Sequence, residues 1–555
     1  MSKLLPYLCL VLLMVGCSTP LVPEARLPEL PRAEMPDRLL LECLRADWQI
    51  LGRRDVSDKA RARAQHRYND NLLVLLRRMR YDATHDADGQ VAGEKQGVQV
   101  HHQFMRKELP LHVVYDDMIP AADVELDALK ERYTISGLGV PMVGIVPSRK
   151  LPRNLKDAFP VATRGTVSSV TAVLQFPKAG PPELLLNLRH RTENIRVGAM
   201  QYRLAGDVSA ALEVYWDLTR LKDDRMLGLL NPQELRDTTG LSCIETYDPN
   251  KIPVILTHGL MSSAGTFDNL VNRLLSHEEI RRNYQFWYFN YSSGVAWTQI
   301  ARRYRDALAQ VRERVDPEHR NPNWERMVVV GHSMGGLITH YSQCEEPWNI
   351  LKGATGLNQR RLAAYLDAKY VDTPFADVRM ETLRRDYFFR PVQAGLVVYM
   401  ATPHRGAPMA RYRIVELFTR MVKLPQTLVQ EAINITTLQQ DMLLLNPGNA
   451  LAWFTSVNQL APDSYSISGL QRLKVRSART HSIIGDRGEG NSPQSSDGVV
   501  PYWSSHIAWG TESIVPADHS VQDVPETAED MRVLLLDYSR RNPAVHIRRR
   551  DGVRW

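Results

Sequence analysis

The residues with the clearest chemical potential lie in the middle of the chain, between an apolar run and a helical pattern. Residues 328–336 read VVVGHSMGG, which places Ser333 in a Gly-x-Ser-x-Gly motif followed by a further glycine. A serine on a tight turn between a buried strand and a helix needs glycine two residues before and after it, because larger side chains would clash with neighbouring backbone. The turn also directs the Met334 N–H and the helix N-terminus at the site, where both stabilise a developing oxyanion. Ser333 is therefore predicted to be a nucleophile.

A serine nucleophile needs a base that takes its proton and an acid that orients the base. Downstream of Ser333, Asp497 lies in the polar segment SSDGVVP (495–501) and His519 lies in the segment ADHS (517–520). Both follow predicted strands, and the chain order Ser, Asp, His suits a catalytic triad on a strand–helix scaffold. We predict that His519 is the base and Asp497 the acid.

Other residues compete for these two roles. Asp486, in the segment IIGD (483–486), also follows a predicted strand and is a second candidate for the acid. His404 and His506 are further candidates for the base, although His506 precedes the last predicted strand. Asp518 is expected to stabilise its loop or face solvent. The residues alone leave these alternatives open.

The elements that must position these side chains begin after Pro249. Strand-like apolar runs there alternate with helical patterns, as in a mostly parallel sheet covered by helices. The runs span residues 253–257, 286–291, 327–330, 395–400, 481–484 and 513–515, and residues 296–315 are predicted to form a crossover helix. The fold class of this half is therefore α/β.

These segments resemble bacterial triacylglycerol lipases and the wider group that contains GPI-inositol deacylase-like hydrolases, within the α/β-hydrolase superfamily. The resemblance rests on the serine motif, the segment DGVV (497–500), the segment ATPHRG (401–406) and a strand that ends in His258 and Gly259, and it covers about residues 250–540. It implies an α/β-hydrolase fold, a serine acyl-enzyme mechanism and Asp497 rather than Asp486 as the acid.

The same resemblance implies further roles. The backbone N–H of Leu260 would be the second oxyanion donor beside that of Met334, whereas His258 and His404 would be structural. Val521 stands where many lipases of this type carry a calcium-binding aspartate, so the resemblance does not extend to a calcium site. We therefore expect no metal and no cofactor, because the mechanism runs on protein groups alone.

The N-terminal half carries no catalytic motif. Apolar residues recur at near-helical spacing within 41–51 and 72–79, which predicts two helices that pack on each other. Residues 98–104 and 168–176 are predicted strands, and residues 199–219 a helix. We expect an α+β accessory domain over residues 35–248, whose role and protein partner the sequence does not indicate.

The first residues predict where the protein resides. Lys3 and the apolar run 4–15 form a signal peptide too short to span a bilayer, and MVGC (14–17) resembles the lipobox of bacterial lipoproteins. That class implies removal of residues 1–16, lipidation of Cys17 and, with Ser18 next, an outer-membrane anchor facing the periplasm. Residues 17–34 are rich in proline and would form a tether.

Composition limits the remaining classes of function. Lys and Arg number 69 against 62 Asp and Glu, a modest excess that does not indicate a nucleic-acid-binding protein, and much of it lies near the basic tail 541–555. Once Cys9 is removed and Cys17 lipidated, three cysteines remain, and their pairing is left open: Cys43, Cys243 and Cys344.

The expected hydrolase domain spans residues 249–540, with cap insertions near 345–390 and 407–470. Apolar residues at helical spacing in the second insertion, together with the lipid anchor, favour a lipid or long-chain acyl ester as the substrate. The predicted protein is a membrane-anchored serine esterase. An acyltransferase that uses the same triad and a non-catalytic envelope scaffold are the alternatives.

Overall fold

The computed structural model describes residues 32–79, 94–95, 98–102, 117–147, 159, 165–188, 193–219, 239–245, 247–293, 296–350, 358, 360–361, 364, 385–408, 459–475, 479–488 and 494–545. Cys17, the signal peptide and most of the tether lie outside this set. Most of both cap insertions and most of the basic tail lie outside it as well. Within it, no helix is both long and apolar enough to cross a membrane.

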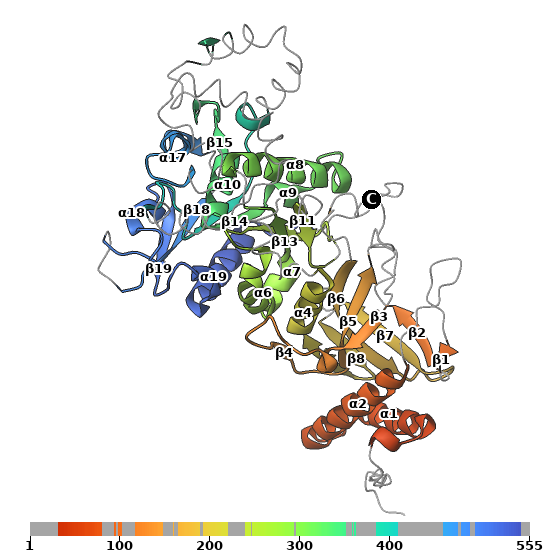
Figure 1. Ribbon diagram of the computed structural model, residues 1–555. Coiled ribbons are helices and arrows are strands. Elements are labelled where there is room, and N and C mark those ends of the chain that lie inside the picture. Colours follow the sequence, from red (N-terminus) through yellow and green to blue (C-terminus); the bar gives the residue numbers. More distant parts are fainter. Residues whose placement is uncertain are drawn as a thin grey trace, which may run out of the picture.

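A seven-stranded sheet forms the centre of the C-terminal half (Figure 1). Its order is β11-β13-β12-β14-β16-β18-β19. The strands are β11 (Gly240–Cys243), β12 (Ile252–Thr257), β13 (Tyr284–Asn290), β14 (Val328–His332), β16 (Leu396–Met400), β18 (Arg479–Gly485) and β19 (Thr511–Val515). All neighbouring pairs are parallel except β11 with β13. The α/β class and all six predicted strand runs are therefore confirmed.

Helices cover both faces of this sheet because its strands are apolar on both sides. Val329 and Val397 pack on one face with α8 (Trp297–Val315) and α10 (Met334–Ser342). Val328 and Val398 point to the opposite face, with α6 (Asp268–Leu275), α7 (Glu278–Asn283) and α19 (Pro525–Arg541). The predicted crossover helix is α8. Shorter helices are α9 (Pro322–Glu325), α17 (Tyr465–Leu470), α18 (Tyr502–Ser505), η6 (Ala264–Phe267) and η9 (Val521–Asp523).

The N-terminal half holds a second sheet with the order β1-β2-β7-β6-β5-β3. Its strands are β1 (Glu94–Lys95), β2 (Val98–His102), β3 (Asp117–Pro120), β5 (Val140–Pro147), β6 (Gly165–Gln175) and β7 (Glu183–Leu188). The predicted helix pair is α1 (Asp37–Leu51) and α2 (Asp58–Met79), which lies at the end of the molecule remote from β19 (Figure 1). Tyr68 of α2 joins the pair to β6, because its hydroxyl donates to Leu174 O and accepts from Leu174 N.

The helix predicted from residue 199 begins later than expected. Residues 200–203 instead form strand β9 (Met200–Arg203), and α4 spans Val208–Thr219. Tyr202 is buried between exposed neighbours, the alternation of a strand, and Asp207 starts the helix by accepting a hydrogen bond from Ala210 N at 2.9 Å. Small elements complete this half: η1 (Arg32–Glu34), η3 (Ala121–Asp123), β4 (Thr134–Ile135), β8 (Asn194–Val197) and β10 (Gly206–Asp207).

The two halves share one continuous interior. Tyr215 of α4 stacks on Tyr288 of β13 with ring centroids 6.2 Å apart, and its hydroxyl donates to Ser242 Oγ at 2.8 Å. Strand β11 lies before the boundary expected at residue 249, yet it is the edge strand of the C-terminal sheet. Cys43, Cys243 and Cys344 are buried and free, and Cys344 begins the short strand β15 (Cys344–Glu345), which pairs with β17 (Lys474–Val475).

Candidate active site

Ser333 occupies the turn between β14 and α10 in a strained backbone conformation. Its φ is 53° and its ψ is −123°, a region that non-glycine residues avoid unless surrounding structure holds them there. Close packing explains the glycines around it: a Cβ at Gly331 would lie 2.5 Å from the Gly336 Cα, and a Cβ at Gly335 would lie 2.1 Å from Thr257 O. The turn therefore holds the Ser333 side chain at the carboxyl end of the sheet.

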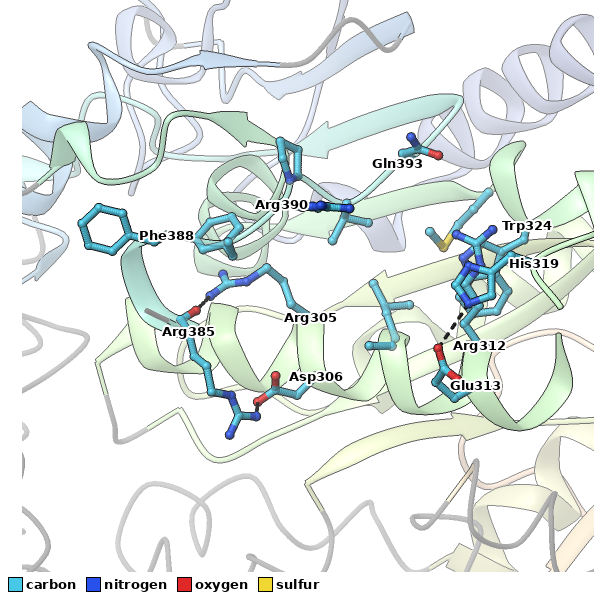
Figure 2. Close-up of a pocket in the computed structure, with 16 residues that line it drawn as sticks. Arg305, Asp306, Arg312, Glu313, His319, Trp324, Arg385, Phe388, Arg390 and Gln393 are labelled. Atoms are coloured by element: carbon cyan, nitrogen blue, oxygen red, sulfur yellow. Dashed lines mark hydrogen bonds and ion pairs between the residues drawn. The ribbon is translucent and has the colours of Figure 1, made fainter. Parts of the chain in front are cut away.

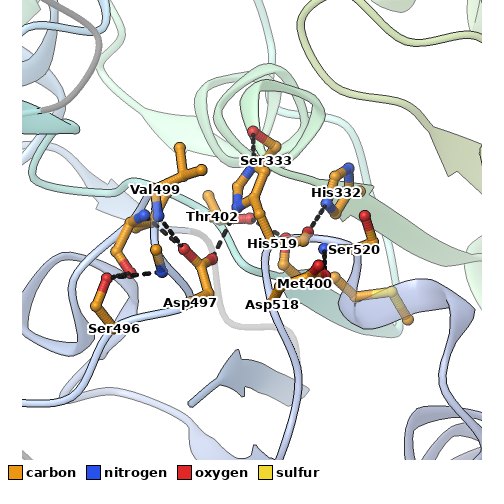
Figure 3. Close-up of polar contacts among 12 residues, drawn as sticks. His332, Ser333, Met400, Thr402, Ser496, Asp497, Val499, Asp518, His519 and Ser520 are labelled. Carbon is orange, nitrogen blue, oxygen red and sulfur yellow. Dashed lines mark hydrogen bonds and ion pairs between the residues drawn. The ribbon is translucent and has the colours of Figure 1, made fainter. Parts of the chain in front are cut away.

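Two loops bring an acid and a base to this serine (Figure 3). The His519 Nε2 lies 2.9 Å from Ser333 Oγ, and the His519 Nδ1 lies 2.7 Å from Asp497 Oδ2. A carboxylate can only accept hydrogen bonds, so His519 carries its proton on Nδ1 and leaves Nε2 to accept from the serine hydroxyl. The structure thus joins the three residues that the sequence selected, which lie 186 and 22 positions apart.

Backbone groups hold the acid in place. Asp497 Oδ1 accepts hydrogen bonds from Val499 N at 2.7 Å and Val500 N at 2.6 Å, and the side chain is 1% exposed. The second carboxylate oxygen is then free to face His519. The loop that carries Asp497 follows β18, and the loop that carries His519 follows β19. Because these two strands are parallel neighbours, the loops that follow them emerge at the same edge of the sheet.

His332, the residue before the serine, has a role that the motif did not reveal. Its Nε2 lies 2.8 Å from the backbone O of His519, so the ring donates a hydrogen bond that holds the loop of the base. Burial lowers the pKa of His332 to about 3, which keeps the ring neutral. The histidine in the Gly-His-Ser-x-Gly motif is the sequence feature that could have indicated this role. The motif does not predict a contact with a residue 187 positions away.

The expected oxyanion loop lies directly against the serine. A Cβ at Gly259 would lie 3.0 Å from the Ser333 Cβ, and Met334 is the buried first residue of α10. His258 stacks on Tyr291 with ring centroids 4.0 Å apart, and the Tyr291 hydroxyl donates to the His258 carbonyl. Burial lowers the pKa of His258 to about 4, which suits a neutral structural residue. Leu260 follows in this loop and is half-buried.

The competing candidates form other contacts. Asp486 Oδ1 accepts from Gly488 N at 2.8 Å, and Asp518 Oδ1 accepts from Ser520 N at 2.9 Å, so both stabilise turns. His506 faces Glu512, with its Nδ1 2.7 Å from the carboxylate. His404 contacts His340 through their Nδ1 atoms, 3.0 Å apart. In the described ranges, no three His, Cys, Asp or Glu side chains are grouped to hold a metal ion.

The arrangement can perform nucleophilic chemistry on a carbonyl group. A serine oxygen shares its proton with a histidine, the histidine is oriented by a buried carboxylate, and the N-terminus of α10 faces the same point.

Comparisons with known proteins return lipases and esterases among solved structures. The mature form of a Bacillus licheniformis lipase is 12% identical to this chain. The match covers 53% of this chain and 96% of the lipase chain, with a TM-score of 0.30. A metagenomic carboxyl esterase is 15% identical, with coverages of 53% and 78% and a TM-score of 0.30. A lipase-esterase related protein from Clostridium acetobutylicum is 10% identical, with coverages of 54% and 99% and a TM-score of 0.26. No family model and no curated protein matches the chain.

Proposed function

We propose that this protein is a serine hydrolase of the α/β-hydrolase superfamily that cleaves carboxylic esters through an acyl-enzyme. The observation that carries the proposal is the unbroken hydrogen-bond relay from Asp497 through His519 to Ser333, with distances of 2.7 and 2.9 Å. The strained turn at Ser333 adds support, since strain of about 1–3 kcal/mol is retained where function needs it.

The reaction proceeds in two halves. His519 Nε2 takes the Ser333 proton as the serine oxygen attacks the ester carbonyl, and the oxyanion is stabilised by the N–H groups of Met334 and Leu260. The carboxylate of Asp497 stabilises the imidazolium, which then protonates the leaving alcohol. Water activated by His519 releases the acyl group and restores the serine.

Labelling with a fluorophosphonate probe tests the proposal. The wild-type protein is expected to react covalently, and Ser333→Ala and His519→Ala are expected to lose the label. Ser520→Ala is the matched control, because Ser520 is an exposed serine beside the base and should leave labelling unchanged. A wild-type protein that is folded yet does not label would contradict the hydrolase proposal and favour a scaffold.

For the substrate we propose a lipid or long-chain acyl ester. The support is the predicted lipid anchor at Cys17, which would hold the enzyme at a membrane surface, together with the apolar pattern of residues 407–470. A series of p-nitrophenyl esters should give increasing kcat/KM from short to long acyl chains. Activity confined to two- to four-carbon esters would refute this part and leave the hydrolase proposal standing.

We further propose that the mature protein is anchored to the outer membrane through Cys17. The support is the sequence MVGC followed by a serine. Cys17→Ser should move the protein from the membrane fraction to the soluble or unprocessed fraction in a bacterial host, whereas Cys43→Ser should not. Retention of the Cys17→Ser variant in the outer membrane after full processing would contradict the anchor.

A further inference from the structure

The loop that carries the second proposed oxyanion donor is held by side chains that follow the neighbouring strand. β12 ends at Thr257 and β13 ends at Asn290, and the two strands are parallel neighbours. The segments that follow them, residues 258–261 and 291–293, therefore emerge at one edge of the sheet. Ser333 lies at the same edge, because β14 is parallel to β12. Side chains of these segments hold three successive peptide units of the loop.

The first peptide unit joins His258 to Gly259. Its carbonyl accepts a hydrogen bond from the Tyr291 hydroxyl, and the Tyr291 ring stacks on the His258 ring at an interplanar angle of 6°. The second peptide unit joins Gly259 to Leu260. Its carbonyl lies 2.9 Å from His258 Nδ1, and because a carbonyl only accepts, the ring nitrogen donates. A peptide bond is planar and trans, so the Leu260 N–H points away from the carbonyl that His258 holds.

The third peptide unit joins Leu260 to Met261, and Ser293 holds it. The Met261 N–H donates to Ser293 Oγ at 3.1 Å, and Ser293 is 3% exposed. Met261 has a φ of 53°, a left-handed conformation that a residue with a side chain avoids unless its surroundings hold it there. The hydrogen bond to Ser293 offsets this strain. Its loss would let Met261 move to a more favourable φ and turn the peptide unit that precedes it.

Leu260 stands between the second and the third peptide units. With both units held, Leu260 cannot rotate about either of its backbone bonds, so the direction of its N–H is fixed. Among the residues that the structure describes, none accepts a hydrogen bond from Leu260 N. The loop also lies against the nucleophile, since a Cβ at Gly259 would be 3.0 Å from the Ser333 Cβ. The Leu260 N–H is therefore an immobilised and available donor on the loop that contacts Ser333.

Ser293 itself lies between two packed elements, β13 before it and α8 after it. The first residue of α8, Trp297, is buried and packs edge-on against Tyr341 of α10, the helix that follows the nucleophile, with ring centroids 5.7 Å apart. Further along α8, Arg305 Nη2 donates to the Arg385 carbonyl at 2.7 Å (Figure 2). Ser293 is thus placed by elements that also position the nucleophile.

We propose that Ser293 is a positioning residue for the ester hydrolysis: it fixes the backbone around Leu260 so that the Leu260 N–H is preorganised for the oxyanion. The inference rests on the proposed function, because the oxyanion forms only if Ser333 attacks a carbonyl. A preorganised donor stabilises the transition state more than the bound ester, since it is directed at the position where charge develops. Loss of the Ser293 hydroxyl should therefore lower kcat more than it changes KM.

Hydrolysis of a p-nitrophenyl ester by the full chain tests this role. Ser293→Ala should lower kcat about tenfold, less than the 10²–10³-fold or so that follows direct loss of an oxyanion donor, and should change KM by less than about twofold. The affinity for a trifluoromethyl ketone, whose serine adduct carries the same oxyanion, should fall by the same factor as kcat/KM. The pH at which kcat/KM is half-maximal should not move, because the contacts of His519 with Ser333 and Asp497 are unchanged.

Ser262→Ala is the matched control. Ser262 follows the same loop, and its hydroxyl donates to the Ser263 carbonyl at 3.5 Å, outside the held peptide units, so kcat should equal that of the wild type. An active wild type together with unchanged kcat and ketone affinity in Ser293→Ala would overturn the positioning role. A loss that appears in KM or in the pH profile instead would also overturn it, since the substrate site or the triad would then be displaced. A wild type that neither labels nor hydrolyses the ester would contradict the hydrolase proposal, and this role with it.

Discussion

Gly336→Ala is expected to lower both the stability and the reactivity of the protein. A Cβ at residue 336 would lie 1.8 Å from Thr402 Oγ1 and 2.5 Å from Thr402 Cγ2, whereas ordinary contact begins at 3.4 Å. Helix α10 and the segment after β16 must therefore move apart by more than about 1 Å, because a packed interior has no spare volume. Overpacking by one methyl group costs about 1–3 kcal/mol. Because the 1.8 Å approach is severe, the cost should be about 2–3 kcal/mol, and alanine regains at most about 1 kcal/mol of helix propensity, which leaves a net loss of about 1–2 kcal/mol.

The same displacement should change the position of Ser333. Gly336 N donates to Ser333 O at 2.9 Å, so a shift of α10 moves the nucleophile away from His519. A misplacement of about 1 Å costs about 100-fold in rate. Urea unfolding measures the first effect, and the rate of fluorophosphonate labelling measures the second.

Thr402→Gly provides the decisive comparison. It removes the side chain that the new methyl group meets, so the double variant should recover at least about 1 kcal/mol relative to the sum of the single variants. Gly265→Ala is the control, because its nearest neighbour would be the flexible Asp268 carboxylate at 3.2 Å. The steric reasoning is refuted if Gly336→Ala unfolds at the same urea concentration as the wild type. It is also refuted if the losses of stability in Gly336→Ala and Thr402→Gly simply add in the double variant.

Three further predictions concern the acid, the oxyanion loop and pH. Asp497→Asn should lower the rate of fluorophosphonate labelling by about 10⁴-fold. The N–H groups of Val499 and Val500 would hold the amide oxygen and turn the NH₂ group toward His519, which favours the wrong histidine tautomer. A loss below tenfold would contradict this. Tyr291→Phe leaves the buried His258 carbonyl without its donor and should cost about 1–3 kcal/mol in urea unfolding. Burial holds the pKa of His258 at about 4, below the 6.5 of an unperturbed histidine, so the unfolded chain binds a proton that the folded chain does not. The contribution of His258 should therefore be full above pH 6.5 and fall by up to about 1.4 kcal/mol per pH unit between pH 6.5 and 4. His332, whose pKa burial lowers to about 3, adds a loss of the same sign, and a flat profile in urea unfolding would refute the reasoning.

Much of the C-terminal fold could be predicted because its signals are local. Strands such as β12, β14 and β16 are apolar runs bounded by turn residues, and α8 is a long amphipathic pattern, so neither signal requires knowledge of a partner. The helix predicted from residue 199 was wrong over 199–207, where Gly198, with a φ of 53°, turns the chain between two strands. That hairpin depends on pairing with β8, which helical periodicity does not report.

The accessory half was predictable only in outline. The helix pair was visible from its apolar stripes, but Tyr68 binds a strand 106 positions away. The antiparallel edge strand β11 is four residues long and carries no pattern of its own that assigns it to the C-terminal sheet. Its place is decided by pairing with β13, a tertiary contact.

The sequence alone determined which residue types could react and in what order they occur. Chain order and the neighbouring glycines selected Ser333, Asp497 and His519, because a strained turn and a loop after a strand impose local requirements on residue type. Only the tertiary structure decided that Asp497 rather than Asp486 faces the histidine, and that His332 holds the loop of the base. Hydrogen bonds and burial depend on distance in space, and residues far apart in the chain meet only after the sheet has aligned the ends of its strands.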